Sequence, residues 1–307
     1  MVIKNIFYIF FFIVTVIILN YIMMYYSFKK KHHLLLKDLI NIEEKYNIEN
    51  QDNIVKEFEK NGAFMIPDIL SNSECDELLK IMSKFEFNKN NEIGDIKSMH
   101  KRKDLMLPLE LTENYIKKIY LKIKNFCDIV VPEAKLIEIS SFITYPGCFP
   151  QIWHSDHAYL KYKDNANIIT FGIALDDITD DMGPLEVFLG SNHIWKDIDK
   201  LYKKYNIKDD LLNNVAADED DIKDGLKEQS LEKLCNLLNF NHKKFSCKKG
   251  SLVAWSTTVC HRGGQNNKKK RPVFYFSLMG KGNCPDNTVY SILKKGKYTY
   301  INYENDD

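Results

Sequence analysis

The sequence predicts a mainly β domain with flanking helices, an α+β fold of the jelly-roll or barrel type, preceded by one N-terminal transmembrane helix. Three observations support this prediction. An uncharged apolar stretch opens the chain, helical apolar spacing follows to about residue 127, and short β-rich runs separated by turns begin at residue 136. Several strands after a helical section are typical of two sheets, or a barrel, with helices packed outside.

Residues 1–28 predict a membrane anchor. No residue from Asn5 to Phe28 is charged, and a run of that length spans a bilayer as a helix. No small-residue cleavage site follows, as a signal peptide requires. Lysine is scarce before the run and abundant after it, beginning at Lys29. Because positive charges stay inside, we expect a single-pass membrane protein with its C-terminal domain in the cytosol.

Beyond the anchor, we expect a juxtamembrane linker over residues 29–50 and one large domain over residues 51–307. Residues 196 to about 247 are highly charged and break the strand rhythm of this domain. Leu231, Leu234, Cys235 and Leu238 nevertheless recur there at helical spacing. We interpret the stretch as an insertion between strands, either a lid over the site or a solvated decoration.

Local signals place the elements of the domain. One helix is expected to end at Gly62, a second to begin at the capping box Ser71–Glu74, and a third to run from about Thr112 to Cys127. The predicted strands are 63–66, 136–143, 167–175, 185–189, 251–256 and 272–279, with turns at 145–147, 182–184 and 262–264.

Composition excludes several classes of protein. The hydrophobic fraction of 45% is that of a globular domain, not of a disordered chain. The formal net charge of +1 gives no reason to expect a nucleic-acid partner, and no protein partner is inferred. The 7 cysteines are odd in number and form no CxxC pair, which argues against a disulfide framework and against a zinc ribbon.

The candidate catalytic residues begin with Trp153-His154-Ser155-Asp156. On a strand, residues i and i+2 point to one face, so His154 and Asp156 can present a nitrogen and a carboxylate oxygen to one ion. His261 stands at the end of the predicted strand 251–256, just before a Gly-Gly turn. Two histidines and one carboxylate leave open positions on iron(II), the arrangement that non-haem oxygenases use.

Arg271 is the candidate cofactor-binding residue. It follows the turn after His261, and an antiparallel return would lay it next to the strand of His261. A guanidinium binds a carboxylate with two parallel hydrogen bonds. Arg271 is therefore well placed to bind the far carboxylate of a dicarboxylate chelated to the metal.

These segments, in this order and spacing, resemble the phytanoyl-CoA dioxygenase family of Fe(II)/2-oxoglutarate-dependent oxygenases over about residues 54–280. The resemblance rests on FEKNGAFMIPDIL from Phe58, WHSD from Trp153, IALDDITDDMGPLEVFLGSNH from Ile173, KGSLVAW from Lys249 and HRGGQNNKKKR from His261.

The resemblance implies a double-stranded β-helix with N-terminal helices, iron ligands His154, Asp156 and His261, and Arg271 as the partner of the distal carboxylate of 2-oxoglutarate. It implies that 2-oxoglutarate and O2 are consumed, that succinate and CO2 are released, and that a small-molecule or lipid-like substrate is hydroxylated. Tyr145 stands where the family often has lysine, and Gly172 where it often has an aromatic residue, so the substrate is not inherited.

Two other classes of function stay open at this point. One is a non-catalytic binding or scaffold protein with the same fold, against which the intact ligand set argues. The other is a cupin-like metal protein that does not use 2-oxoglutarate, such as a zinc or manganese isomerase. Arg271 counts against that alternative.

Overall fold

The structure, a computed structural model, describes residues 51–86, 101–156, 166–207 and 230–282. The predicted anchor (1–28) and linker (29–50) lie outside these ranges. Among the helices within them, none is both long and apolar enough to cross a membrane.

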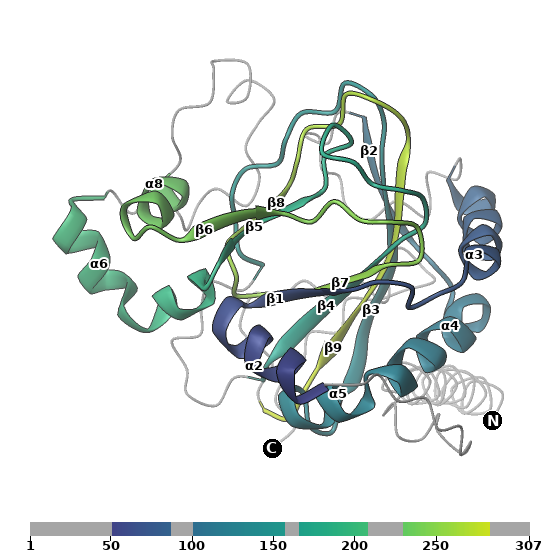
Figure 1. Cartoon of the computed structure of the whole chain (residues 1–307), viewed down its shortest axis with the longest axis horizontal. Coiled ribbons are helices and arrows are strands. Elements are labelled where there is room, and N and C mark those ends of the chain that lie inside the picture. Colours follow the sequence, from purple (N-terminus) through teal and green to yellow (C-terminus); the bar gives the residue numbers. More distant parts are fainter. Residues whose placement is uncertain (1–50, 87–100, 157–165, 208–229, 283–307) are drawn as a thin grey trace, which may run out of the picture.

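Two antiparallel sheets face each other, as expected for a double-stranded β-helix (Figure 1). The larger sheet has the order β1-β7-β4-β9-β3-β2 and the smaller one the order β6-β5-β8. The strands are β1 (Ala63–Ile66), β2 (Arg102–Met106), β3 (Lys135–Thr144), β4 (Ile168–Ala174), β5 (Leu185–Leu189), β6 (Asn241–Lys244), β7 (Leu252–Ser256), β8 (His261–Gly263) and β9 (Arg271–Met279). The predicted strands are confirmed to within one residue at each end.

Helices cover the outer face of the larger sheet, and others pack at one end of the smaller sheet (Figure 1). Those on the larger sheet are α2 (Gln51–Asn61), α3 (Asn72–Phe85), α4 (Leu109–Lys122) and α5 (Lys124–Val130). Those on the smaller sheet are the 3-10 helix η3 (Ser191–Asp197), α6 (Ile198–Tyr205) and α8 (Ser230–Leu237). The result is an α+β fold with helices on the larger sheet and at one end of the smaller one.

Alternation along the strands decides which side chains face inward. Phe274 and Phe276 of β9 belong to the core cluster that packs on the helices. Phe126 of α5 reaches that cluster with its ring edge-on to Phe171 of β4, at a centroid distance of 6.4 Å. Because successive strand residues point to opposite faces, Arg271 and the alternate residues after it face the smaller sheet.

The predicted helix boundaries are confirmed where local chemistry sets them. Gly62 follows α2 with a φ of +74°, which a glycine adopts without strain. The capping box of α3 is complete: the amide of Ser71 donates to Glu74 Oε2 at 2.8 Å, and the amide of Glu74 donates to Ser71 Oγ at 3.4 Å.

The predicted helix from Thr112 to Cys127 is wrong as a single element. The chain forms α4 and α5 in its place, with a break at Ile123, where φ is −116° and ψ is 21°. The side chain of Ile123 remains fully buried, so the apolar spacing runs through the break unchanged. Periodicity therefore cannot reveal it.

The described parts of the charged stretch 196–247, residues 196–207 and 230–247, are more than an insertion between strands. The helix expected around Leu231 is confirmed as α8, and Leu234 is fully buried. However, Asn241–Lys244 forms β6, which pairs with β5 in the smaller sheet. This strand reads Asn-His-Lys-Lys and lies mostly exposed, so it carries no apolar alternation that would have predicted it.

Candidate active site

Two short segments of chain bring the predicted histidines together. His154 and His261 form an isolated antiparallel bridge, in which each amide donates to the other's carbonyl at 3.0 and 2.8 Å. The expectation that His261 ends the strand 251–256 is wrong. The chain leaves β7 through a turn closed by Val259 N to Ser256 O, and His261 begins β8 in the smaller sheet.

The three predicted metal ligands converge on one point. Asp156 Oδ1 lies 3.6 Å from His154 Nε2 and 3.7 Å from His261 Nε2, and one ligand atom from each residue falls within 4.8 Å of the others. These separations let all three atoms reach one ion, and the donor set of two imidazoles and a carboxylate suits iron(II). The side chain of His261 is 6% exposed and that of Asp156 is 36% exposed, so the site opens on the Asp156 side.

Backbone carbonyls fix the orientation of both imidazoles. His154 Nδ1 lies 2.8 Å from the carbonyl of Ile152, and His261 Nδ1 lies 2.9 Å from that of Val259. A protonated Nδ1 leaves the Nε2 lone pair free for a metal. Burial, reinforced by the neighbouring His261, lowers the pKa of His154 to about 4, so this ring is neutral at pH 7, as a ligand must be.

An ionic cluster centred on the buried Glu186 lies behind the two histidines, on the outer face of the smaller sheet. Glu186 of β5 accepts a hydrogen bond from Arg262 Nε at 2.8 Å, and it also pairs with His242 and Lys244; we call these four residues the Glu186 cluster. The guanidinium of Arg262 lies 4.4 Å from the ring centre of Trp153. Trp153 and Arg262 adjoin the two histidine ligands in the sequence, so this contact holds both segments from behind.

Arg271 reaches the site from the larger sheet. It pairs with Thr144 of β3, so the expectation that it lies on a strand beside that of His261 is wrong. The two residues belong to different sheets, and Arg271 approaches the His261 strand at Gly263. Gln151 lies at the same place, and its Oε1 accepts from the amide of Gly263 at 2.8 Å. A Cβ at Gly263 would lie 2.7 Å from Gln151 Oε1 and 3.9 Å from an amino nitrogen of Arg271, so glycine leaves room for both.

Arg271 has the properties expected of an anion-binding residue. It is 4% exposed, its Nε has no hydrogen-bond partner, and no carboxylate of the described residues pairs with it. Burial, together with the charge of Arg102, lowers its pKa to about 10. A buried guanidinium is costly unless a carboxylate binds it, so the residue fits the distal carboxylate of 2-oxoglutarate.

Arg102 is a site residue that the sequence analysis missed. It lies opposite Thr144, which in turn lies opposite Arg271, so the two arginines flank one threonine across three strands. Its Nε donates to Cys148 Sγ at 2.7 Å, and a terminal nitrogen donates to the carbonyl of Phe149. The stretch around Arg102 is charged, so only the pairing of β2 with β3 identifies it.

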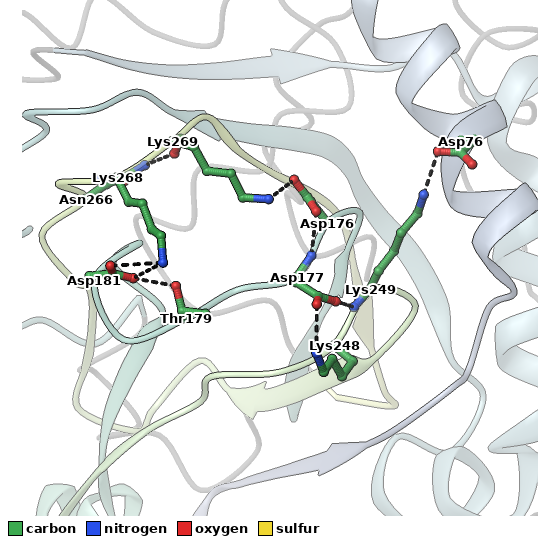
Figure 2. A network of polar contacts seen from close by, with 10 residues as sticks. All are labelled: Asp76, Asp176, Asp177, Thr179, Asp181, Lys248, Lys249, Asn266, Lys268 and Lys269. Carbon is green, nitrogen blue, oxygen red and sulfur yellow. Dashed lines mark hydrogen bonds and ion pairs between the residues drawn. The ribbon is translucent and has the colours of Figure 1, made fainter.

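The loop that leads to Arg271 is held by surface ion pairs (Figure 2). Lys269 contacts Asp176 at 2.6 Å, and Lys268 contacts Asp181 at 3.2 Å. In the same acidic turn, Asp177 accepts a hydrogen bond from the amide of Lys249 at 2.9 Å. We call this set the surface lattice; its members are Asp76, Asp176, Asp177, Asp181, Lys248, Lys249, Lys268 and Lys269.

The two departures from the family pattern have partners in the structure. Tyr145 donates to Glu86, which also accepts from Lys270; burial works to raise the pKa of Glu86, but these contacts hold it below its usual value. At Gly172, a Cβ would lie 3.1 Å from the ring of Trp255, so the tryptophan of β7 fills the space where the family often has an aromatic residue.

The sequence profile of the phytanoyl-CoA dioxygenase (PhyH) family matches residues 58–273, which include all four predicted site residues. The chain belongs to this family. No curated protein matches it in sequence.

Solved structures share the fold at low sequence identity. EvdO2 from Micromonospora carbonacea var. aurantiaca is 16% identical, with a TM-score of 0.51 over 78% of this chain and 96% of that one. The epimerase SnoN, solved with Fe3+ and α-ketoglutarate, is 11% identical, with a TM-score of 0.51 over 75% and 83% of the two chains. EctD from S. alaskensis, solved with bound Fe, is 15% identical, with a TM-score of 0.50 over 76% and 79%.

Family membership and geometry together identify the protein as an Fe(II)- and 2-oxoglutarate-dependent oxygenase with the facial triad His154, Asp156 and His261. Iron and 2-oxoglutarate are its cofactors.

Proposed function

We propose that this protein hydroxylates a small organic substrate and converts 2-oxoglutarate and O2 into succinate and CO2. The observation that carries the proposal is the pairing of the triad with an unpartnered, buried guanidinium at Arg271. Iron and 2-oxoglutarate supply the oxidising chemistry when bound.

The chain's own residues contribute position and shielding. His154 and His261 would hold the metal through their Nε2 atoms, because carbonyls at Nδ1 fix the orientation of both rings. Arg271 binds and orients the co-substrate through its distal carboxylate, and Arg102 adds positive charge beside it. The ring centre of Trp255 lies 5.9 Å from that of His261, so the indole packs beside this ligand.

The proposal can be tested without knowing the substrate. The full-length protein is purified without O2, loaded with Fe(II) and titrated with 2-oxoglutarate, while the visible metal-to-ligand charge-transfer band is recorded. A saturable band that weakens in Arg271→Ala and disappears in His261→Ala supports the proposal. Bound metal without a band favours the cupin-like alternative, and neither metal nor band favours a non-catalytic scaffold.

The cellular placement is a separate proposal. The uncharged run within residues 1–28 and the lysines after it support a single-pass membrane protein whose catalytic domain, residues 51–307, faces the cytosol behind the 29–50 linker. Protease treatment of sealed membrane vesicles tests this topology. Digestion of the C-terminal domain from the cytosolic side supports it, and protection overturns it.

A further inference from the structure

The 3-10 helix η3 lies against the stretch of chain that leads into His261. Its first residue, Ser191, is fully buried and makes hydrogen bonds in two directions. The hydroxyl accepts from the amide of Cys260 at 2.8 Å and donates to the carbonyl of Phe188 at 2.6 Å. Phe188 is bonded to the same stretch, because its amide donates to the carbonyl of Cys260 at 3.0 Å. Ser191 thus joins β5 to the residue directly before an iron ligand.

A second side chain of η3 bonds to the preceding peptide group. The indole Nε1 of Trp195 donates to the carbonyl of Thr258 at 2.6 Å, and both residues are buried. The amide of the same peptide group, that of Val259, donates to the carbonyl of Ser256 at 3.0 Å. The peptide groups before and after Val259 are therefore each held by one side chain of η3.

The peptide group between Val259 and Cys260 also orients the imidazole of His261. Its carbonyl lies 2.9 Å from His261 Nδ1, and its N–H is the group that donates to Ser191. Because a peptide group is planar, the direction of its N–H fixes the direction of its C=O. By holding the N–H, Ser191 determines where the carbonyl points and, through the carbonyl, how the ring is oriented.

These contacts form one continuous chain of hydrogen bonds that ends at the iron ligand. The Ser191 hydroxyl donates to Phe188, the peptide N–H donates to the hydroxyl, and the carbonyl of Val259 lies at His261 Nδ1. All members are buried, and in such surroundings each hydrogen bond polarises the next. The chain favours the tautomer with hydrogen on Nδ1, which leaves Nε2 free for a metal.

The helix η3 is itself fixed on its other side by α2. The amide of Gly190 donates to the carbonyl of Asn61 at 2.8 Å, and His193 Nε2 lies 2.9 Å from the carbonyl of Glu59. Gly190 has a φ of +87°, which a glycine adopts without strain. The helix is therefore bonded to α2 on one side and to the segment before His261 on the other.

We propose that Ser191 and Trp195 are positioning residues for the iron site: through the peptide groups on either side of Val259, they set the orientation and the tautomer of His261. Both side chains act through the backbone. The inference concerns the metal site itself, so it holds whichever substrate is oxidised. A purely structural role of η3 would instead affect His154 and His261 equally.

The first test observes the imidazoles in the protein without metal. Full-length wild type, Ser191→Ala and Trp195→Phe are prepared with isotope-labelled histidine, and two-bond proton–nitrogen NMR correlations report the tautomer of each ring. We expect hydrogen on Nδ1 of His261 in wild type and a mixture of tautomers in both variants, with His154 unchanged. Ser141→Ala is the matched control, because it removes a hydroxyl that is equally buried and has no hydrogen-bond partner among the described residues.

Iron affinity is the second readout. Ser191→Ala should raise the Fe(II) Kd roughly tenfold, since partners behind a metal ligand are worth about 10–100-fold in metal affinity. Equilibrium dialysis without O2 measures the Kd, and urea denaturation of the metal-free protein shows that the variant is folded. Ser141→Ala should keep the wild-type Kd.

Four results overturn the inference: hydrogen on Nε2 of His261 in wild type, an unchanged tautomer in Ser191→Ala, a wild-type iron Kd in that variant, or an equal disturbance of His154. If Ser191→Ala does not fold, Trp195→Phe takes its place, and if neither folds, the wild-type tautomer decides by itself. A charge-transfer band in wild type with any of these results overturns this inference alone. No band overturns the proposed function and leaves the tautomer measurement valid.

Discussion

The segment from His261 to Arg271 is held at its two ends by ionic groups of very different surroundings. The Glu186 cluster supports the His261 end: the side chain of Glu186 is 5% exposed and that of Arg262 is 17% exposed. The surface lattice supports the Arg271 end: the side chains of Lys269 and Asp176 are 47% and 39% exposed (Figure 2).

The difference teaches that burial, and not the number of ion pairs, decides how much each group contributes to the free energy of unfolding. Exposed pairs contribute about 0–1 kcal/mol, because water and salt screen them. Loss of one partner from a buried set leaves an uncompensated charge and costs several times more. The metal-binding end is therefore expected to be rigid. The position of the co-substrate end is expected to depend on the buried Asn266. Its side-chain amide donates to Thr144 Oγ1 at 3.0 Å and to the carbonyl of Lys269 at 2.8 Å.

The largest effect is expected from removing a metal ligand at the rigid end. Asp156→Ala should lower iron affinity by more than roughly 100-fold and abolish succinate formation, because even outer-shell partners of ligands are worth about 10–100-fold. Metal analysis after equilibrium dialysis measures the first effect. Wild-type iron content in this variant would contradict the assignment of the site.

The next effect is expected at the co-substrate end. Arg271→Ala should raise the 2-oxoglutarate Kd by roughly 30-fold, since a charge-assisted pair of hydrogen bonds is lost, while iron binding is kept. Arg271→Lys keeps the positive charge but not the paired hydrogen bonds of the guanidinium, so its 2-oxoglutarate Kd should fall between those of wild type and Arg271→Ala. The charge-transfer titration measures all three proteins, and an unchanged Kd in Arg271→Ala would transfer the role to Arg102.

The Glu186 cluster should yield a stability effect of intermediate size. Glu186→Gln is expected to lower the free energy of unfolding by about 2 kcal/mol, because Arg262 loses its charged partner in a buried place. Urea denaturation at pH 7 measures it, with the exposed Glu57→Gln as control. A loss as small as that of the control would mean that the cluster is solvated.

The same variant should also change the dependence of stability on pH. Burial acts to raise the pKa of Glu186, but His242 and Arg262 outweigh it and lower the pKa from 4.5 to about 2. The native state then holds fewer protons than the unfolded state, so this stabilisation is complete above about pH 5 and is lost as the pH falls toward 2. The difference between wild type and Glu186→Gln should shrink over that range; a constant difference would exclude the carboxylate as its source.

The smallest effect is expected from the surface lattice. Lys269→Ala should change the free energy of unfolding by about 0.5 kcal/mol or less and leave the 2-oxoglutarate Kd within about twofold. Urea denaturation and the charge-transfer titration measure these quantities at low and high salt. A large rise of the Kd would show that the lattice, and not Asn266, sets the position of Arg271.

The sequence by itself determined the elements and the chemistry that depend on neighbours along the chain. The capping box at Ser71, the turn at Gly62 and the short apolar strands are local, so their residue types are sufficient to place them. The triad and Arg271 were found in the same way, because the family's motifs keep residue type and spacing within short segments.

Only the tertiary structure decided which strands pair and therefore which side chains meet. Register is set between residues far apart in the sequence, and one-residue shifts exchange the two faces of a strand. For this reason neither Arg102 beside Arg271 nor Asp104 beside Tyr275 could be predicted, and β6 was missed because its pairing, not its composition, makes it a strand. The iron site was thus predictable from the sequence, whereas the surroundings of Arg271 follow from long-range packing.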